Sequence, residues 1–348
     1  MLNIVALYEY ATNGRPHGSS YIRTMLPLDH PSVKGELQTD FSTEFRVGDV
    51  LLIDRTWTPY IAPELAEQVV RQARRSGMKL VYSLDDNLMD VNDYFPFRRI
   101  FSDGQVASVR YFASHADHVI VSTEPLRKRL QSLNSNISVI PNYLDERLFA
   151  KKIPEKKSHD KVVLGYMGTA SHEADLLSIL EPLRSLLHRY RDSLSLELVG
   201  VIDPFRKKAM FGDLPVSVKT VPIECVEYPD FVQWMRDSLQ WDIGLAPLEN
   251  SPFTACKSDI KWLDYSMLGI PAVFSSSEAY SNSVTNNETG LIADSIDEWY
   301  HALKKMIDDT VLRNQIRECT FKTVKRTRTL EHNANQWLNI LKEINDNA

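Results

Sequence analysis

The chain is poor in cysteine. It carries three, Cys225, Cys256 and Cys319, which lie far apart among its 348 residues and leave an odd thiol. Their positions show no metal-ligand spacing, and a sparse, odd set argues against a disulfide framework. The cysteine content therefore favours a reducing cytoplasm.

Positive charge and long apolar stretches are scarce as well. Lys and Arg number 40 against 46 Asp and Glu, a net charge of −6, whereas a general nucleic-acid binder needs a basic surplus. No stretch approaches the roughly 18 apolar residues of a membrane span, and the opening "MLNIVALYEYA" predicts a first strand rather than a signal peptide. We therefore expect no nucleic-acid partner, and any membrane contact to be peripheral, at the inner face of the membrane.

The chain does contain short apolar runs that alternate with helical patterns from end to end. This alternation is typical of parallel sheets covered by helices. The predicted strands are "NIVALYEY", "DVLLID", "KLVYSLDD", "HVIVST" and "ISVIPN" in the first half, and "KVVLGYMG", "LSLELVG", "VKTVPI", "WDIGLAPL", "PAVFSS" and "TGLIA" in the second.

A chain of this length predicts two domains. The lysine-rich stretch at 148–161 has no apolar period and predicts a linker. We therefore expect two doubly wound α/β domains, residues 1–150 and 151–325, followed by one amphipathic helix within 326–348.

The stretch "KSDIKWLDYSMLGIPAV" predicts a short amphipathic helix followed by a strand. A period of 3.6 residues places Lys257, Lys261 and Asp264 on one face. Gly269 suits the left-handed position just past the helix end, and Pro271 cannot continue the helix. On the residues alone, the charged face is most simply solvated surface, with Asp264 as an i,i+3 partner of Lys261.

A second stretch, "VVLGYMGTASHEADLLSIL", predicts a strand, a turn and a helix from about Glu173. Gly165 and Gly168 would let backbone approach a ligand, while Thr169 and amides at the helix start suit a phosphate. The stretch lacks the G-x-G-x-x-G spacing of a dinucleotide site.

The order of these motifs resembles the GT-B glycosyltransferases, above all the retaining family 4. The resembling stretches are "ADHVIVSTEPLRKRL", "VIPNYLDERLF", "LGYMGTASHEADL", "LELVG", "WDIGLAPLENSPF", "KSDIKWLDYSMLGIPAVFS" and "ETGLIADSIDEWYHAL". Two of them, "KSDIKWLDYSMLGIPAV" and "VYSLDDNLMDV", resemble bacterial enzymes that build surface polysaccharides and O-antigens.

The resemblance implies two Rossmann-like domains that face each other across a cleft. The N-terminal domain would bind the acceptor, the C-terminal domain would bind the nucleotide sugar, and the last helix would pack back on the N-terminal domain. It implies a hexosyltransferase that moves a sugar, with retention, from a nucleotide-sugar donor to a glycan or lipid-linked acceptor. Neither a metal nor a cofactor is expected. Two alternatives stay open, a sugar-nucleotide 2-epimerase and a non-catalytic nucleotide- or glycan-binding scaffold.

The family's donor residues carry over only in part. Of two glutamates eight positions apart, the ribose-binding one falls on Asp264 and the other on Cys256. The Arg and Lys that clamp the diphosphate fall on Thr169 and near Ala174, and are absent. Lys261 is then one candidate cation for the diphosphate.

Two neighbours of Lys261 would assist it. Lys257 is the second candidate cation and Ser258 a further hydrogen-bond donor. With Gly168 and Thr169, these are the residues expected to contact the nucleotide-sugar donor.

In the first domain, the resemblance implies a glycine-containing loop that reaches towards the donor phosphates. Gly18 and Ser19 fit such a loop, and Tyr21 and Arg23 behind it are acceptor candidates together with Arg55.

Asp85 and Asp86 follow a predicted strand at its carboxyl end, where open α/β sheets bind their ligands. They would position an acceptor hydroxyl or stabilise positive charge developing on the sugar. Two other interpretations stay open for them, a solvated capping loop and a site for a hard cation.

Overall fold

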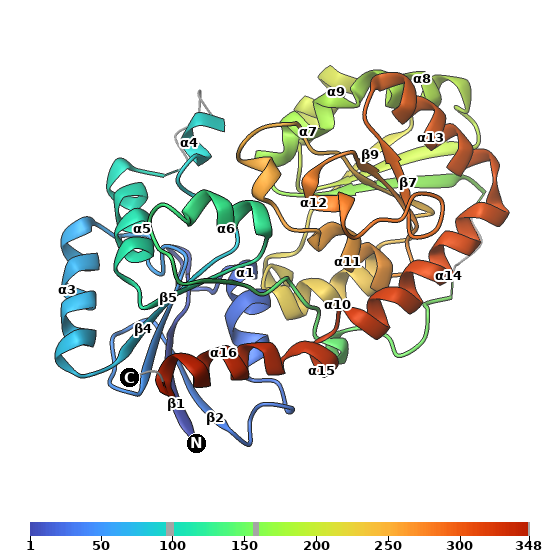
Figure 1. Ribbon diagram of the computed structural model, residues 1–348. Coiled ribbons are helices and arrows are strands. Elements are labelled where there is room, and N and C mark those ends of the chain that lie inside the picture. The colour runs from blue at the N-terminus through green and yellow to red at the C-terminus, as the bar shows by residue number, and fades with distance from the viewer. Residues whose placement is uncertain (95–100, 156–159, 347–348) are drawn as a thin grey trace. The chain divides into compact units, whose positions relative to one another are not determined.

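The computed structural model describes residues 1–94, 101–155 and 160–346, and these form two compact units (Figure 1). Unit 1 comprises Met1–Asp145, Ser251–Ser258 and Arg328–Ala348, and unit 2 comprises Glu146–Asn250 and Asp259–Thr327. The division falls after Asp145, where the sequence suggested 150. Residues 156–159 of the expected linker and the last two residues of the expected final helix lie outside the described residues.

Unit 1 is built on a six-stranded parallel sheet in the order β2-β1-β3-β4-β5-β6. Five strands confirm the sequence prediction, and β2 was not predicted. It is a largely polar edge strand whose Leu37 lies opposite Leu2 of β1, so it lacks the apolar run of the inner strands. The strands are β1 (Leu2–Leu7), β2 (Leu37–Ser42), β3 (Val50–Asp54), β4 (Lys79–Leu84), β5 (His118–Val121) and β6 (Ile137–Val139).

Helices cover both faces of this sheet, because successive side chains of a strand point to opposite faces. Val5 and Leu7 of β1 belong to one core, which α3, α5 and α6 complete. Ile4 and Ala6 belong to the other core, which Trp337 of α16 helps to close. The helical segments of unit 1 are α1 (Gly18–Ser20), η1 (Tyr21–Met25), α2 (Leu26–Leu28), α3 (Pro63–Arg75), α4 (Val91–Tyr94), α5 (Asp103–His115), α6 (Glu124–Leu130), η5 (Thr254–Cys256), α15 (Leu330–Asn333) and α16 (Asn335–Asp346).

Unit 2 repeats this plan with a six-stranded parallel sheet in the order β12-β11-β10-β7-β8-β9. Its strands, all predicted from the sequence, are β7 (Val162–Met167), β8 (Leu194–Val199), β9 (Val216–Lys219), β10 (Ile243–Ala246), β11 (Ala272–Ser275) and β12 (Leu291–Ala293). Its helical segments are η2 (Glu146–Leu148), η3 (Ala170–His172), α7 (Glu173–Ser178), α8 (Leu180–Arg189), α9 (Pro204–Phe211), η4 (Ile223–Cys225), α10 (Tyr228–Ser238), α11 (Ile260–Met267), α12 (Glu278–Ser281), α13 (Ile296–Asp308) and α14 (Thr310–Thr327).

The predicted helix ends are confirmed where the local chemistry is strong. Thr123 caps α6 by accepting a hydrogen bond from the Leu126 amide, as a hydroxyl at this position should. Gly77 after α3 and Gly269 after α11 both have φ of +68°, the left-handed conformation that glycine adopts at least cost. Among the described residues, no helix is long and apolar enough to span a bilayer.

Candidate functional site

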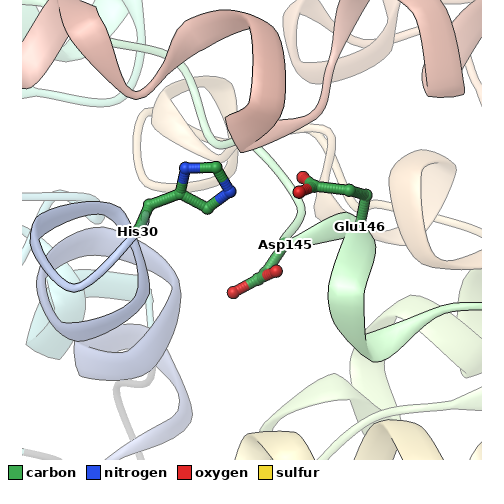
Figure 2. A group of neighbouring side chains, drawn as sticks. All are labelled: His30, Asp145 and Glu146. Carbon is green, nitrogen blue, oxygen red and sulfur yellow. The ribbon is translucent and has the colours of Figure 1, made fainter. Parts of the chain in front are cut away.

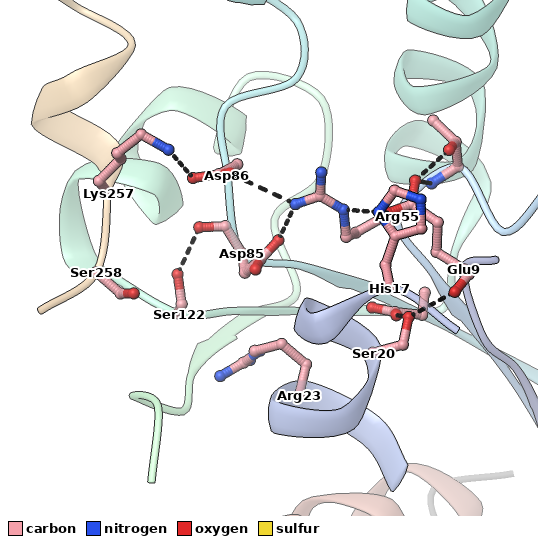
Figure 3. A network of polar contacts seen from close by, with 12 residues as sticks. Glu9, His17, Ser20, Arg23, Arg55, Asp85, Asp86, Ser122, Lys257 and Ser258 are labelled. Atoms are coloured by element: carbon pink, nitrogen blue, oxygen red, sulfur yellow. Dashed lines mark hydrogen bonds and ion pairs between the residues drawn. The ribbon is translucent and has the colours of Figure 1, made fainter. Parts of the chain in front are cut away.

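A network of charged side chains lies at the carboxyl ends of three neighbouring strands of unit 1 (Figure 3). Arg55, directly after β3, is its centre. The Arg55 Nε donates to Glu9 Oε2 at 2.6 Å, and its Nη1 donates to Asp85 and lies 3.5 Å from Asp86 Oδ2. Glu9 follows β1, and both aspartates follow β4. Because β2 and β3 flank β1, the network occupies the point where the strand order reverses, the usual ligand position in such sheets.

The backbone holds Arg55 in an uncommon conformation. Its φ is +52°, and that of Trp57 is +57°, a region that costs a non-glycine residue about 1–3 kcal/mol. Three hydrogen bonds fix the turn: Arg55 N to Ser83 O, Trp57 N to Asp54 O, and Tyr82 Oη to Arg55 O, at 2.8–3.0 Å. Such strain is common at functional sites.

The buried charges of the network stabilise each other. Burial alone would raise the pKa of Glu9, but Arg55, His17 and a hydrogen bond from Thr56 hold it below its usual value. Burial would likewise lower the pKa of Arg55, but Asp85 and Glu9 raise it well above normal. Glu9 and Arg55 therefore stay ionised, and this pair does not exchange protons near neutral pH.

Asp54, at the end of β3, behaves differently. It is fully buried and accepts a hydrogen bond from Ser20 Oγ at 2.6 Å. Burial raises its pKa to about 7, which the Ser20 bond only partly offsets. Among the described residues, its Oδ1 has no hydrogen-bond partner, in keeping with a carboxyl that is easily protonated.

Lys257 belongs to unit 1, although most of the second half of the chain does not. Its Nζ lies 3.1 Å from Asp86 Oδ1 and 4.7 Å from the centroid of the Phe253 ring. Its segment is held by two further hydrogen bonds, Thr123 Oγ1 to Cys256 O at 2.9 Å and Asn142 Nδ2 to Ser258 Oγ at 2.8 Å.

The expectation that Lys257, Lys261 and Asp264 share a helix face is wrong. Helix α11 begins at Ile260, and Lys257 precedes it in extended backbone with φ of −68° and ψ of 153°. Cys256 is 3% exposed and packs into a core of unit 1, so its side chain serves packing there.

The loop expected at Gly18 and Ser19 is helical. Both residues belong to α1, which continues into the π-helical η1 with the half-buried Tyr21. Arg23 is 1% exposed, donates to Ile140 O at 2.6 Å and to Asn142 Oδ1 at 3.0 Å, and lies over the ring of Trp337. A guanidinium buried in this way stabilises the fold of unit 1, whereas the sequence predicted a contact between Arg23 and the acceptor.

In unit 2, one glycine lies within β7 and another in the turn after it, and the two have different roles. A Cβ at Gly165 would lie 1.7 Å from Trp241 Cδ2, so this glycine admits an indole ring and not, as expected, a ligand. A Cβ at Gly168 would lie 2.9 Å from His172 Cδ2. The Thr169 and Ser171 hydroxyls lie 2.7 Å apart on the same turn.

Lys261 and Asp264 lie on α11 of unit 2. The half-buried Lys261 has its Nζ 5.8 Å from the centroid of the Tyr166 ring, beside β7. Asp264 is 5% exposed, and its Oδ1 accepts a hydrogen bond from Tyr228 Oη at 2.8 Å. Burial raises the pKa of Asp264 to about 7, against the opposing effects of Tyr228 and Lys261. The ribose contact of Asp264 stays a prediction.

One further group of ligand-type side chains contains His30, Asp145 and Glu146 (Figure 2). His30 and Asp145 are buried, and Glu146 is half-buried. His30 Nδ1 is hydrogen-bonded to Ser32 Oγ at 2.7 Å, and all three residues have other interaction partners. No sequence pattern pointed to this group, and we assign no role to it.

No protein-family model and no curated protein matches the sequence. Solved structures do match. HepE from Anabaena, in complex with UDP and glucose, superposes with a TM-score of 0.69 at 13% identity, over 99% of this chain and 100% of HepE. WaaG, a glycosyltransferase involved in lipopolysaccharide biosynthesis, gives 0.65 at 14% identity, over 97% and 99%. The sucrose-phosphate synthase of Thermosynechococcus elongatus gives 0.64 at 14% identity, over 86% and 75%.

This chain has the GT-B fold. The GT-B assignment from the motif order is thus confirmed, and each unit supplies one of the fold's two sheets. Of the predicted site residues, unit 1 brings together Arg55, Asp85, Asp86 and Lys257, while Lys261 and Asp264 lie on one helix of unit 2.

Sequence reasoning missed two carboxylates in this GT-B chain, Glu9 and Asp175. Glu9 follows a predicted strand, so its position could have flagged it in the way that position flagged Asp85. Asp175 Oδ2 lies 2.7 Å from His172 Nδ1, and the spacing of three residues between them is a helical one that allows such a contact.

The raised pKa of Asp264 leads to a prediction about stability. A carboxyl whose pKa is higher in the folded than in the unfolded chain favours folding when protonated. Its contribution is therefore complete below about pH 3.8 and is lost as the pH rises to about 7. Asp264→Asn should raise the melting temperature relative to wild type at pH 8, and less at pH 5. The exposed Asp294→Asn is the control, and an equal gain at both pH values would contradict the prediction.

Proposed function

We propose that this protein is a glycosyltransferase that moves a sugar from a nucleotide sugar to an acceptor hydroxyl. The observation that carries the proposal is the match of fold along almost the whole chain with HepE, a protein solved with UDP and glucose. The charge network of unit 1 supports it, because it stands at the strand ends where open α/β sheets bind their ligands.

The finer assignment is a retaining enzyme of bacterial surface polysaccharide synthesis with a glycan or lipid-linked acceptor. The likeness to WaaG, which acts in lipopolysaccharide biosynthesis, supports this acceptor class. The scarcity of cysteine supports action in the cytoplasm, at the inner face of the membrane, where lipid-linked acceptors would be met.

In this proposal the reaction breaks the bond between the anomeric carbon and a phosphate oxygen, and the electron pair stays on the departing diphosphate. A new bond forms between the acceptor oxygen and the same face of the anomeric carbon, and the hydroxyl proton leaves with the diphosphate. Groups that stabilise the growing negative charge lower the barrier. Lys261 and the turn at Gly168 and Thr169 are the residues proposed for this task, and Asp264 is proposed to hold the ribose.

Asp85 and Asp86 are proposed to orient the acceptor. Asp86 is the more exposed of the two, at 25% against 13%, and is the better placed to accept a hydrogen bond from a sugar hydroxyl. Lys257, which pairs with Asp86, then positions this carboxylate. That role replaces the diphosphate contact expected from the sequence.

Chelation should leave the activity nearly unchanged, because protein cations rather than a divalent ion are proposed to offset the diphosphate charge. The measurement is turnover after treatment with EDTA and dialysis. Loss of turnover that magnesium or manganese restores would contradict the prediction and would reassign Asp85 and Asp86 as metal ligands.

The function itself is tested by incubating the purified protein with UDP-, GDP-, dTDP- and CMP-sugars, with and without a glycan acceptor. A glycosyltransferase releases the nucleotide faster when the acceptor is present. Conversion of the sugar without acceptor would identify a 2-epimerase. Binding without turnover would favour a scaffold, and the absence of any binding in a thermal-shift screen would overturn the proposal.

A further inference from the structure

The turn after β7 in unit 2 presents a histidine that a buried carboxylate holds in place. His172 Nδ1 lies 2.7 Å from Asp175 Oδ2. Asp175 is 1% exposed, and its other oxygen accepts a hydrogen bond from the Glu249 amide at 2.8 Å. Both carboxylate oxygens are therefore engaged, and the orientation of the carboxylate is fixed before any ligand arrives.

The turn also makes room for the imidazole ring. A side chain at Gly168 would collide with His172, because the added Cβ would lie 2.9 Å from Cδ2. The His172 side chain is 17% exposed, so part of the ring is accessible to a ligand. The hydroxyl groups of Thr169 and Ser171 lie on the same turn, 2.7 Å from each other.

The carboxylate determines what the ring can do. A carboxylate that accepts from Nδ1–H fixes the tautomer of an imidazole and stabilises its protonated form. In that form Nε2 carries a proton and can donate a charge-assisted hydrogen bond, which phosphate oxygens accept well.

We propose that His172, positioned by Asp175, binds the diphosphate of the nucleotide sugar and supplies a cationic hydrogen-bond donor there. The inference rests on the proposed function. His172 would supply the positive charge for which the family resemblance implies an Arg and a Lys, at positions that fall on Thr169 and near Ala174 in this chain.

The test compares ligands that differ in the diphosphate. Binding of UDP, uridine and inorganic pyrophosphate is measured by titration calorimetry for wild type and for His172→Gln, which removes the charge. We expect the affinity for UDP and pyrophosphate to fall about 10- to 100-fold, the size of one charge-assisted hydrogen bond. The affinity for uridine should not change.

Two further variants separate this role from a structural one. Asp175→Asn keeps an acceptor for the Glu249 amide but no longer stabilises the charged ring. It should therefore lower the affinity for UDP, as His172→Gln does, without changing the affinity for uridine. His188→Gln replaces an exposed histidine of α8 in the same unit and should change nothing. His172→Arg should retain most of the pyrophosphate affinity that His172→Gln loses.

Several outcomes overturn the inference. The first is a His172→Gln variant that binds UDP and pyrophosphate as tightly as wild type does. The second is a loss of affinity for uridine equal to the loss of affinity for UDP. The third is a wild-type protein that binds neither pyrophosphate nor UDP. If sugar transfer is found and His172→Gln leaves it unchanged, the inference fails while the proposed function stands. If pyrophosphate binds through His172 but no nucleotide sugar is turned over, the proposed function fails and the anion site remains.

Discussion

Lys261→Met is expected to lower turnover by about 10²-fold or more, the usual cost of losing one preorganised donor at a developing oxyanion. The larger effect should be on turnover and the smaller one on donor affinity, because the departing diphosphate gains charge in the transition state. Methionine keeps the apolar stem and loses only the ammonium that lies 5.8 Å from the centroid of the Tyr166 ring, so the melting temperature should change little.

The comparison with two other lysine variants makes this result specific. Lys261→Arg retains the charge and should keep most of the activity. Lys322→Met removes an exposed lysine that pairs with Glu318 on α14 and should be silent. Wild-type turnover in a stable Lys261→Met protein would show that Lys261 does not offset the charge of the departing diphosphate.

Arg55→Met is expected to destabilise unit 1 by about 3–5 kcal/mol, because it leaves buried carboxylates without their partner. Glu9 and Asp85 are 4% and 13% exposed and both bond to this guanidinium. The backbone strain at position 55 should not change, since methionine meets the same cost as arginine at positive φ. Urea unfolding of the two proteins at neutral pH measures the difference.

An exposed ion pair provides the control for Arg55. Arg46→Met breaks the ion pair between Arg46 and Asp40, whose side chains are 58% and 44% exposed, respectively. Such exposed pairs contribute about 0–1 kcal/mol to the stability of a fold. Adding Glu9→Gln to Arg55→Met should recover part of the lost stability, because the double variant buries one charge fewer. A loss below 1 kcal/mol for Arg55→Met would show that the network does not stabilise the fold.

The fold could be predicted well from the sequence because its inner strands are buried on both faces and appear as apolar runs. β3, with five buried residues in five, is the clearest case. The edge strand β2 escaped prediction because only two of its six residues are buried, so only its pairing with β1 identifies it. Helix ends were predicted where one residue decides the geometry, as Gly269 does.

The candidate site was predictable only where it depends on local position. Arg55 and Asp85 were identified because each follows a strand at its carboxyl end. The pairing of Lys257 with Asp86 joins residues 171 positions apart, and no local pattern encodes such a contact. The burial of Arg23 was missed for a similar reason, since it depends on Trp337 near the other end of the chain.

The route of the chain through the two units has a consequence for protein synthesis on the ribosome. Domains usually fold in the order in which they are made. Unit 1 includes the first 145 residues, but one of its cores also needs Trp337, Leu338 and Leu341, and unit 2 already ends at Thr327. One apolar face of the N-terminal sheet therefore stays partly uncovered until unit 2 and the last helix have been synthesised.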